Sequence, residues 1–257
     1  MFQVIAEVAE KVIAAVEEIN ITEGIIQDVQ ELMTQVTEVE SSVSNSLSEV
    51  NAVIEEGQQF EANSSFLRDG HVYQTDDVGR IYRYDNELIS NNEYEINGHV
   101  YQTDDVGRKY RYDDELIPNN EYEINGYQYK TDELGRVTSA EGEAHLKTHE
   151  GRLEIKDSKE TVSHGDAKET DDRGHIIGDQ LDGSNGMENI VAQDAGINQG
   201  AYRKLEDHLA DAIKEGHKVD IKVEPIYGDK LSYRPTEIKY TYTIDGEKNI
   251  TLFPNGR

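Results

Sequence analysis

The sequence predicts an α+β protein of three successive regions. Apolar residues recur at helical spacing through the first 56 residues, which indicates an α-helical, coiled-coil-like front segment. A 28-residue pattern then recurs three times, and each copy alternates apolar and polar residues as a β-hairpin does. The last region has one helical stretch among strand-like stretches, which predicts a mostly antiparallel sheet with a core helix.

Residues 1–56 are predicted to form a helical hairpin or coiled coil. The first helix is indicated by apolar residues at helical spacing between Phe2 and Ile19, and the second should run from Ile25 to about Glu56. Heptad spacing is typical of helices that pack on a neighbour or on a copy of themselves, so self-association is one expected outcome. The valines that repeat every seven residues are Val29, Val36, Val43 and Val50.

Residues 57–68 are expected to be a linker, and residues 69–125 two 28-residue β-repeats. Gly70 and Gly98 occupy corresponding positions, and each precedes the stretch His-Val-Tyr-Gln-Thr-Asp-Asp-Val-Gly-Arg. A diverged third copy follows Gly126, at the start of a C-terminal domain expected to span residues 126–257. A fixed period of this size is typical of stacked units.

The repeats leave two questions open. Aspartates and asparagines at these positions usually shape turns, whereas a calcium site is the alternative interpretation of the Asp-Asp pairs. An EF-hand loop needs a specific run of oxygen ligands, which these turns lack. Exposed tyrosines in the repeats would also suit a cell-wall or carbohydrate-binding role.

In the C-terminal domain, residues 139–163 are expected to be irregular, with a strand near residues 153–155. A helix is expected from Gln199 to Glu215, because Gly216 is a typical residue at a helix end. Alternating apolar residues predict a strand over residues 218–227. A closing hairpin, residues 237–244 with 248–253, should turn at Asp245-Gly246.

The formal net charge is −28, and most of the acidic excess lies in the first half of the chain. Residues 1–143 contain 9 Lys+Arg and 31 Asp+Glu, whereas residues 144–257 contain 16 and 22. With this charge composition, we expect no broad basic surface of the kind that sequence-specific DNA-binding proteins have. The sequence has no cysteine, which excludes disulfides and cysteine-ligated metal sites, and no apolar run long enough to span a membrane. The first 20 residues lack the basic leader of a signal peptide.

Residues 171–206 contain the side chains best suited to chemistry. A histidine can act as a general base near neutral pH. An amide side chain offers a neutral oxygen to Mg²⁺, which takes few protein ligands and keeps several waters. The sequence therefore indicates a site with one general base and one hydrated divalent cation. The residues available to build this site are His175, Asn189, Asn198 and Glu206.

The spacing of these residues resembles a known signature. Asp172-Arg173-Gly174-His175 is followed by Asn189, by Asn198 nine residues later, and by Glu206 eight residues after that. This pattern resembles the DNA/RNA non-specific endonucleases of the ββα-metal (His-Me finger) group. The resemblance implies a C-terminal ββα-metal nuclease domain that hydrolyses phosphodiester bonds in DNA or RNA.

The resemblance also implies roles for the motif residues. His175 would be the general base, Asn198 the ligand of Mg²⁺ (with Mn²⁺ as an alternative), and Glu206 would orient waters on the metal. Arg173 is expected to act in catalysis by positioning a phosphate, or to bridge internally. Asn189 and Asp172 are expected to bind substrate, with loop shaping as the alternative for Asn189.

Family members have a further catalytic arginine upstream of this motif, and several cations of this chain could correspond to it. Arg234 is a candidate from further along the chain, or a residue that only shapes a turn. The upstream candidates are Arg152, Lys156, Lys159 and Lys168.

The order of the regions resembles that of LXG-type polymorphic toxins of Gram-positive bacteria, although the front region has no Leu-x-Gly or Trp-x-Gly signature. The resemblance implies a secreted toxin that leaves the cell without a signal peptide, by a non-classical or type VII-like route, and that requires a cognate immunity protein. One alternative is a secreted scavenging or DNA-uptake nuclease. Another is a repeat-bearing binding protein with an inactive nuclease domain.

Overall fold

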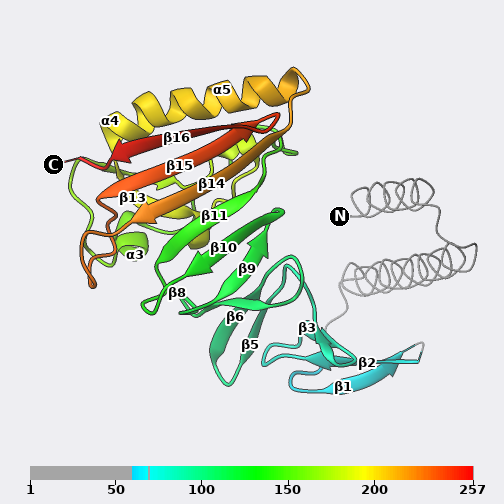
Figure 1. The fold of residues 1–257 in the computed structure, drawn as a ribbon. Helices are drawn as coiled ribbons and strands as arrows, with labels where there is room; N and C mark the ends of the chain where they lie inside the picture. The colour runs from blue at the N-terminus through cyan, green and yellow to red at the C-terminus, as the bar shows by residue number, and fades with distance from the viewer. Residues whose placement is uncertain (1–59, 69, 257) are drawn as a thin grey trace, which may run out of the picture. The chain divides into compact units, whose positions relative to one another are not determined.

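The computed structural model describes residues 60–68 and 70–256, so the helical prediction for residues 1–56 lies outside the described residues. The described residues belong to one unit, Phe60–Arg257. Antiparallel sheets and a few helices build this part of the chain, which confirms the α+β class (Figure 1). Among these residues, no helix has the length and apolar character needed to cross a membrane.

The first two repeats fold into two four-stranded sheets with the same strand order. The first sheet contains β1 (Ser65–Arg68), β2 (His71–Thr75), β3 (Ile81–Tyr84) and β4 (Glu87–Leu88). The second contains β5 (Glu93–Ile96), β6 (His99–Thr103), β7 (Lys109–Tyr112) and β8 (Glu115–Leu116). β1 corrects the expected linker, because residues 65–68 pair with β2.

The glycine that marks each repeat lies in a tight hairpin turn. Asn97 and Gly98 have φ angles of 54° and 74°, and Asn125 and Gly126 have φ angles of 52° and 75°. A type I′ turn requires positive φ at both central residues, which asparagine and glycine tolerate best. The turn geometry therefore explains why Gly recurs with the repeat.

The first aspartate of each Asp-Asp pair joins one repeat to the next. Asp104 is fully buried, and its carboxylate accepts hydrogen bonds from the Arg108 guanidinium (2.8 Å) and from the backbone N–H of Glu123 in the following repeat (2.8 Å). Asp76 makes the same contact with the N–H of Glu95 (2.8 Å). These contacts support the turn-forming interpretation of the Asp-Asp pairs.

Tyrosines form the core of the repeats. Tyr94 stacks on Tyr101 of its own repeat (ring centroids 5.4 Å apart) and on Tyr82 of the preceding one (4.9 Å). Tyr122 stacks in the same way on Tyr129 (5.5 Å). Tyr94 and Tyr122 are buried, so the repeat tyrosines at these positions hold the units together and are not exposed for ligands.

The third repeat is part of the C-terminal sheet. Its strands β9 (Glu121–Ile124), β10 (Tyr127–Thr131) and β11 (Val137–Glu143) continue into β14 (Val219–Ile226), β15 (Glu237–Ile244) and β16 (Glu247–Pro254). The order of this six-stranded sheet is β16-β15-β14-β11-β10-β9. The strands predicted at 218–227, 237–244 and 248–253 are confirmed. The expected boundary at residue 126 falls in the turn between β9 and β10, so β9 belongs with the C-terminal sheet.

Helix α5 (Arg203–Lys214) lies along this sheet (Figure 1). Tyr202, just before it, packs on Tyr240 of β15 (5.6 Å) and Phe253 of β16 (4.9 Å), and Leu209 is fully buried. The helix predicted over residues 199–215 is therefore present. The turn before α5, Asn198–Tyr202, is π-helical and kinked at Gly200, which has non-helical angles (φ −103°, ψ −105°).

A two-stranded hairpin, β12 (Asp171–His175) with β13 (Ile190–Asp194), lies between the sheet strands in sequence. It is followed by the short helix α4 (Ala195–Ile197) and then by α5, which gives the order strand, strand, helix. The strand expected near residues 153–155 is absent, and a short helix, α3 (Lys159–Ser163), forms in the segment expected to be irregular.

Candidate active site

The hairpin β12–β13 places His175 at the end of a strand, opposite Ile190. Gly174 precedes it, and a side chain at that position would overlap Gln193 on the paired strand, so only glycine fits. His175 is 7% exposed. The Asp-Arg-Gly-His sequence thus forms a strand end that is closely covered on one side and carries an imidazole.

Burial lowers the pKa of His175 to about 4, the nearby Arg152 guanidinium lowers it further, and Asp179 partly opposes the shift. The imidazole is therefore neutral at pH 7. Its buried Nε2 has no hydrogen-bond partner among the described residues. A neutral ring with an unpaired nitrogen can accept a proton, which is the requirement for a general base.

Asn198 begins the π-helical turn that leads into α5. Its Nδ2 donates a hydrogen bond to Oδ2 of Asp172 (3.0 Å), and Nε2 of Gln199 donates to the same oxygen (2.8 Å). Because the amide nitrogen is directed at a carboxylate, the amide oxygen remains available for another ligand.

Glu206 is buried on the first turn of α5. Burial raises the pKa of Glu206 to about 8; the Gly178 N–H, which donates to its carboxylate, opposes this shift, Asp207 reinforces it, and Arg152 weakly opposes it. A Cβ at Gly178 would lie 2.5 Å from Oε2 of Glu206, so glycine is required for this contact. Oε1 of Glu206 has no hydrogen-bond partner among the described residues.

One pocket of about 230 Å³ brings the three main candidates together, although they come from different elements. His175 reaches it from β12, Asn198 from the π-helical turn and Glu206 from α5. A second, more open pocket of about 690 Å³ is lined by Asp172, Arg173 and Asn198, among others. Since Asn198 lines both, the imidazole pocket adjoins a wider surface hollow.

Two arginines line both pockets, Arg152 and Arg203. Arg152 is one of the four candidates upstream of the motif, whereas no sequence pattern singles out Arg203, on α5. Lys159 has a structural role instead: its Nζ donates to the backbone carbonyl of Asp171 (3.0 Å) and to two neighbouring carbonyls. Two guanidinium groups beside the imidazole could contact the oxygens of a bound phosphate.

The contacts of Arg173 and Asp172 are mainly internal. Nη1 of Arg173 donates to the backbone carbonyls of Ile155 (3.0 Å) and Asp157 (3.0 Å), which favours the bridging alternative. The Asp172 carboxylate holds the amide of Asn198. Both side chains therefore position parts of the site, and the geometry gives no support to a direct phosphate contact by the Asp172 carboxylate, which has the same charge sign as phosphate.

Asn189 is fully buried and does not line either pocket. Its Oδ1 accepts from the N–H of Ile177 (2.9 Å), and its Nδ2 donates to the carbonyls of Ile177 (2.8 Å) and Ser184 (2.7 Å). These bonds occupy the whole amide and fix the loop after His175. The loop-shaping alternative is favoured over substrate binding.

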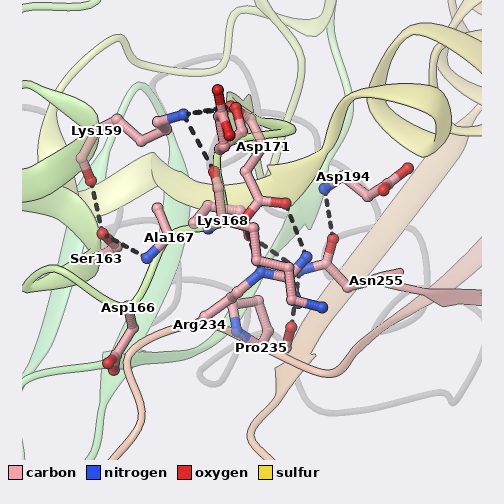
Figure 2. Close-up of polar contacts among 12 residues, drawn as sticks. Lys159, Ser163, Asp166, Ala167, Lys168, Asp171, Asp194, Arg234, Pro235 and Asn255 are labelled. Atoms are coloured by element: carbon pink, nitrogen blue, oxygen red, sulfur yellow. Dashed lines mark hydrogen bonds and ion pairs between the residues drawn. The ribbon is translucent and has the colours of Figure 1, made fainter. Parts of the chain in front are cut away.

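Arg234 is also structural. Its Nε and Nη2 donate to the two carboxylate oxygens of Asp171 (2.6 and 2.8 Å), and both side chains are at most 8% exposed (Figure 2). Beside this pair, Asn255 donates to the carbonyls of Pro235 (2.7 Å) and Ala192 (2.9 Å). The first residue of β12 is thereby anchored to the loop before β15, and Asn255, just after β16, joins β13 to the same loop.

The pocket suits a hydrated divalent cation better than a cation held by several protein ligands. It offers the Asn198 amide oxygen and the unpaired Oε1 of Glu206. No cluster of three or more His, Cys, Asp or Glu side chains with metal-binding geometry occurs among the described residues. Mg²⁺ commonly takes one or two protein oxygens and retains its waters.

A family model for DNA/RNA non-specific endonucleases matches residues 118–246, which include the third repeat, the hairpin β12–β13 and α5. The chain belongs to this family. The matched region, residues 118–246, is the endonuclease domain of this chain.

Two curated proteins are similar to this endonuclease domain. One is the probable deoxyribonuclease RhsA of Dickeya dadantii (strain 3937), which is 36% identical over 105 residues, 41% of this chain and 7% of RhsA. Another is the type VII secretion system protein EssD of Staphylococcus aureus (strain USA300), 33% identical over 138 residues, 46% of this chain and 22% of EssD. The match thus spans less than a quarter of either relative.

Among solved structures, the fold is similar to NucA from Streptococcus agalactiae. The metal-free crystal structure aligns with a TM-score of 0.42 and 18% identity, over 55% of this chain and 82% of NucA. The magnesium-bound structure aligns with a TM-score of 0.41 and 16% identity, over 55% and 73%.

Proposed function

We propose that this chain is a metal-dependent, sequence-non-specific endonuclease that hydrolyses phosphodiester bonds of DNA and of RNA. The observation that carries the proposal is the shared pocket of His175, Asn198 and Glu206, three residues from three elements. The absence of a cysteine, and of a serine next to the histidine in the motif, favours direct attack by water over a covalent intermediate.

His175 is the general base in this mechanism. Its neutral imidazole accepts a proton from the water that attacks phosphorus, and the bond from phosphorus to the leaving oxygen breaks. Arg152 and Arg203, which line both pockets, balance the charge of the phosphate oxygens. A Mg²⁺ or Mn²⁺ held by Asn198, with Glu206 beside it, would supply Lewis-acid stabilisation of the developing negative charge.

Three other motif residues support these groups. Asp172 orients the amide of Asn198, Arg173 holds the segment of residues 155–157 next to the site, and Asn189 fixes the loop after His175. We assign them positioning roles, since the polar atoms of each side chain form hydrogen bonds with other residues of the chain.

We further propose that the protein is a secreted bacterial toxin. The similarity to EssD, described as a type VII secretion system protein, and to RhsA, described as a probable deoxyribonuclease, supports this role. Export would use a non-classical or type VII-like route, and a producing cell would need an immunity protein that covers the pocket. Self-association through residues 1–56 remains a prediction. A secreted scavenging nuclease would differ from a toxin in not requiring an inhibitor, so toxicity on cytoplasmic expression distinguishes the two.

The enzymatic proposal is tested by incubating the full chain with supercoiled plasmid and with RNA in MgCl₂, in MnCl₂ and in EDTA. Cleavage should occur with either cation and stop in EDTA. Asn198→Ala should lower the Mg²⁺-dependent rate at least about 100-fold, as expected for loss of a metal ligand. Lys248→Ala, an exposed change on β16, is the matched control. Equal cleavage in EDTA would contradict the metal requirement.

A further inference from the structure

A small groove lies between the first and second repeats, outside the active site. It has a volume of about 200 Å³. Its walls are aromatic and aliphatic, and its two cations are Arg83 and Lys109. The lining residues are Tyr82, Arg83, Leu88, Tyr94, Ile96, Tyr101 and Lys109.

The same surface recurs 28 residues later, between the second and third repeats, and there the endonuclease domain covers it. Arg111, which corresponds to Arg83, forms a two-point ion pair with Asp157 (Nη2–Oδ1 2.7 Å, Nη1–Oδ2 3.3 Å). Leu116, which corresponds to Leu88, shares a small pocket with Val162 of α3. The segment that covers this copy therefore contributes a carboxylate, Asp157, and an apolar side chain five residues later, Val162.

Coverage accounts for the difference in burial between the two copies. Arg111 is 8% exposed, Leu116 7% and Ile124 8%, whereas their counterparts in the groove are only half-buried. In the described part of the chain, Arg83 has no carboxylate within ion-pair distance, while Arg111 has Asp157. The first groove is thus a copy of an occupied docking surface whose own covering segment is absent from the described residues.

The rim of the groove adds a second positive charge. Lys109 stands where the covered copy has the buried Val137, and its Nζ lies 4.3 Å from the centroid of the Tyr101 ring. An acidic occupant would therefore meet two cations and a set of tyrosine and aliphatic side chains.

We propose that this groove binds a partner protein through a segment that presents a carboxylate close to an apolar side chain, the chemistry that residues 155–164 bring to the covered copy. Nucleic acid fits less well, because residues 60–125 contain 15 Asp+Glu against 6 Lys+Arg and would repel phosphates. The residues that line the groove do not line the active-site pocket, so binding in the groove is separate from hydrolysis.

The probe is a fluorescein-labelled peptide with the sequence of residues 153–165, titrated with the full chain and followed by fluorescence anisotropy. Saturable binding with a Kd below about 1 mM is expected, since a small ligand of a few side chains binds weakly. A peptide with Asp157→Asn should bind at least about tenfold more weakly, because it lacks the charge that Arg83 would pair with.

Variants of the full chain locate the binding. Arg83→Glu and the more exposed Lys109→Glu should each weaken binding at least about tenfold, while Lys248→Glu on β16 should leave it unchanged. Thermal midpoints identify a variant that is not folded, and Lys109→Glu keeps the test valid if Arg83→Glu is unstable. The proposal would be overturned if the peptide did not saturate the chain, or if the Asp157→Asn peptide bound equally well. It would also be overturned if the groove bound a single-stranded oligonucleotide instead of the peptide and Arg83→Glu abolished that binding. A chain dimer dissociated by Arg83→Glu would overturn it too, since the occupant would then be a second copy.

Discussion

In the proposed mechanism Asp172 contacts no reacting atom, but it orients Asn198. Its Oδ2 accepts from the amides of both Asn198 and Gln199, and so fixes which way the Asn198 oxygen faces. Residues that orient a metal ligand typically contribute 10- to 100-fold to affinity or activity. We predict that Asp172→Asn lowers the cleavage rate about 10- to 100-fold and raises the Mg²⁺ concentration for half-maximal rate. Asp211→Asn, on the exposed side of α5, should change neither quantity in the same plasmid assay.

Glu206 gives a pH signature in stability. Because burial raises its pKa in the folded protein to about 8, the folded state holds a proton that the unfolded state has released, and stability falls as pH rises from the unfolded pKa through 8. The lowered pKa of His175 acts in the opposite sense, but its effect fades above the unfolded-state pKa of about 6.5. Between pH 6.5 and 8 the Glu206 contribution is therefore the larger of the two, and a Glu206 variant separates them.

We predict that urea unfolding in EDTA gives a free energy that declines between pH 6.5 and 8, by at most about 1.4 kcal/mol per pH unit. Glu206→Gln should remove most of this decline, whereas the exposed Glu215→Gln should retain it. An identical pH dependence for the wild-type protein and Glu206→Gln would show that Glu206 is not buried as a protonated acid.

The sequence identified His175, Asn198 and Glu206 through their spacing, and the structure places all three in one pocket. It could not rank the four upstream cations, because which of them faces the pocket depends on a segment without regular structure. It also could not separate the two alternatives for Asn189, because its partners Ile177 and Ser184 become neighbours only when the loop folds.

At the level of elements, the hairpin β12–β13 depends on an anchor at its first residue. The Asp171 carboxylate is fully buried and pairs with Arg234 through two hydrogen bonds. Removing the charge of one partner in a buried pair leaves the other uncompensated, which costs about 3–5 kcal/mol.

We therefore predict that Asp171→Asn lowers the free energy of unfolding by about 3 kcal/mol in urea titrations, with a corresponding loss of activity at temperatures where the hairpin opens. Asp211→Asn, which breaks the exposed pair with Lys214, should cost less than about 0.5 kcal/mol. Similar losses for the two variants would contradict the role of Asp171 as an anchor.

Elements with alternating apolar residues were predictable, and those without them were not. The pattern Val219, Ile221, Val223 places one face of β14 in the core, and all three residues are buried. β12 reads Asp-Asp-Arg-Gly-His, a composition that indicates a turn or loop, and it becomes a strand only because β13 pairs with it. β1 is not predictable from its sequence, because its pairing with β2 outweighs the polar residues that precede it.

At the scale of the whole molecule, the second repeat is joined to the endonuclease domain by Arg111 and Asp157. Among residues 60–68 and 70–256, the first repeat has no such contact at Arg83. Both side chains of the Arg111–Asp157 pair are 10% exposed. We predict that Arg111→Ala lowers the free energy of unfolding by about 2–4 kcal/mol, because it leaves Asp157 unpaired. Arg83→Ala should change it by less than about 0.5 kcal/mol. Equal effects in urea titrations would contradict the distinction between the covered and the open copy.

The charge distribution of the chain also has a consequence at this scale. Since residues 144–257 are far less acidic than residues 1–143, the endonuclease domain can approach a polyanion that the repeats repel. The sequence predicted this division, but it could not show that the third repeat completes the endonuclease sheet, because strand pairing over such a distance depends on the folded topology.

The central claim is that His175 accepts the proton of the attacking water, and the initial rate of plasmid cleavage by His175→Ala tests it most directly. We predict a rate at least about 100-fold below that of the wild-type protein in Mg²⁺, with a cooperative thermal transition above the assay temperature as the check on folding. His208→Ala, an exposed histidine on α5, should cleave within about twofold of the wild-type rate. A folded His175→Ala protein that cleaves at the wild-type rate would contradict the account.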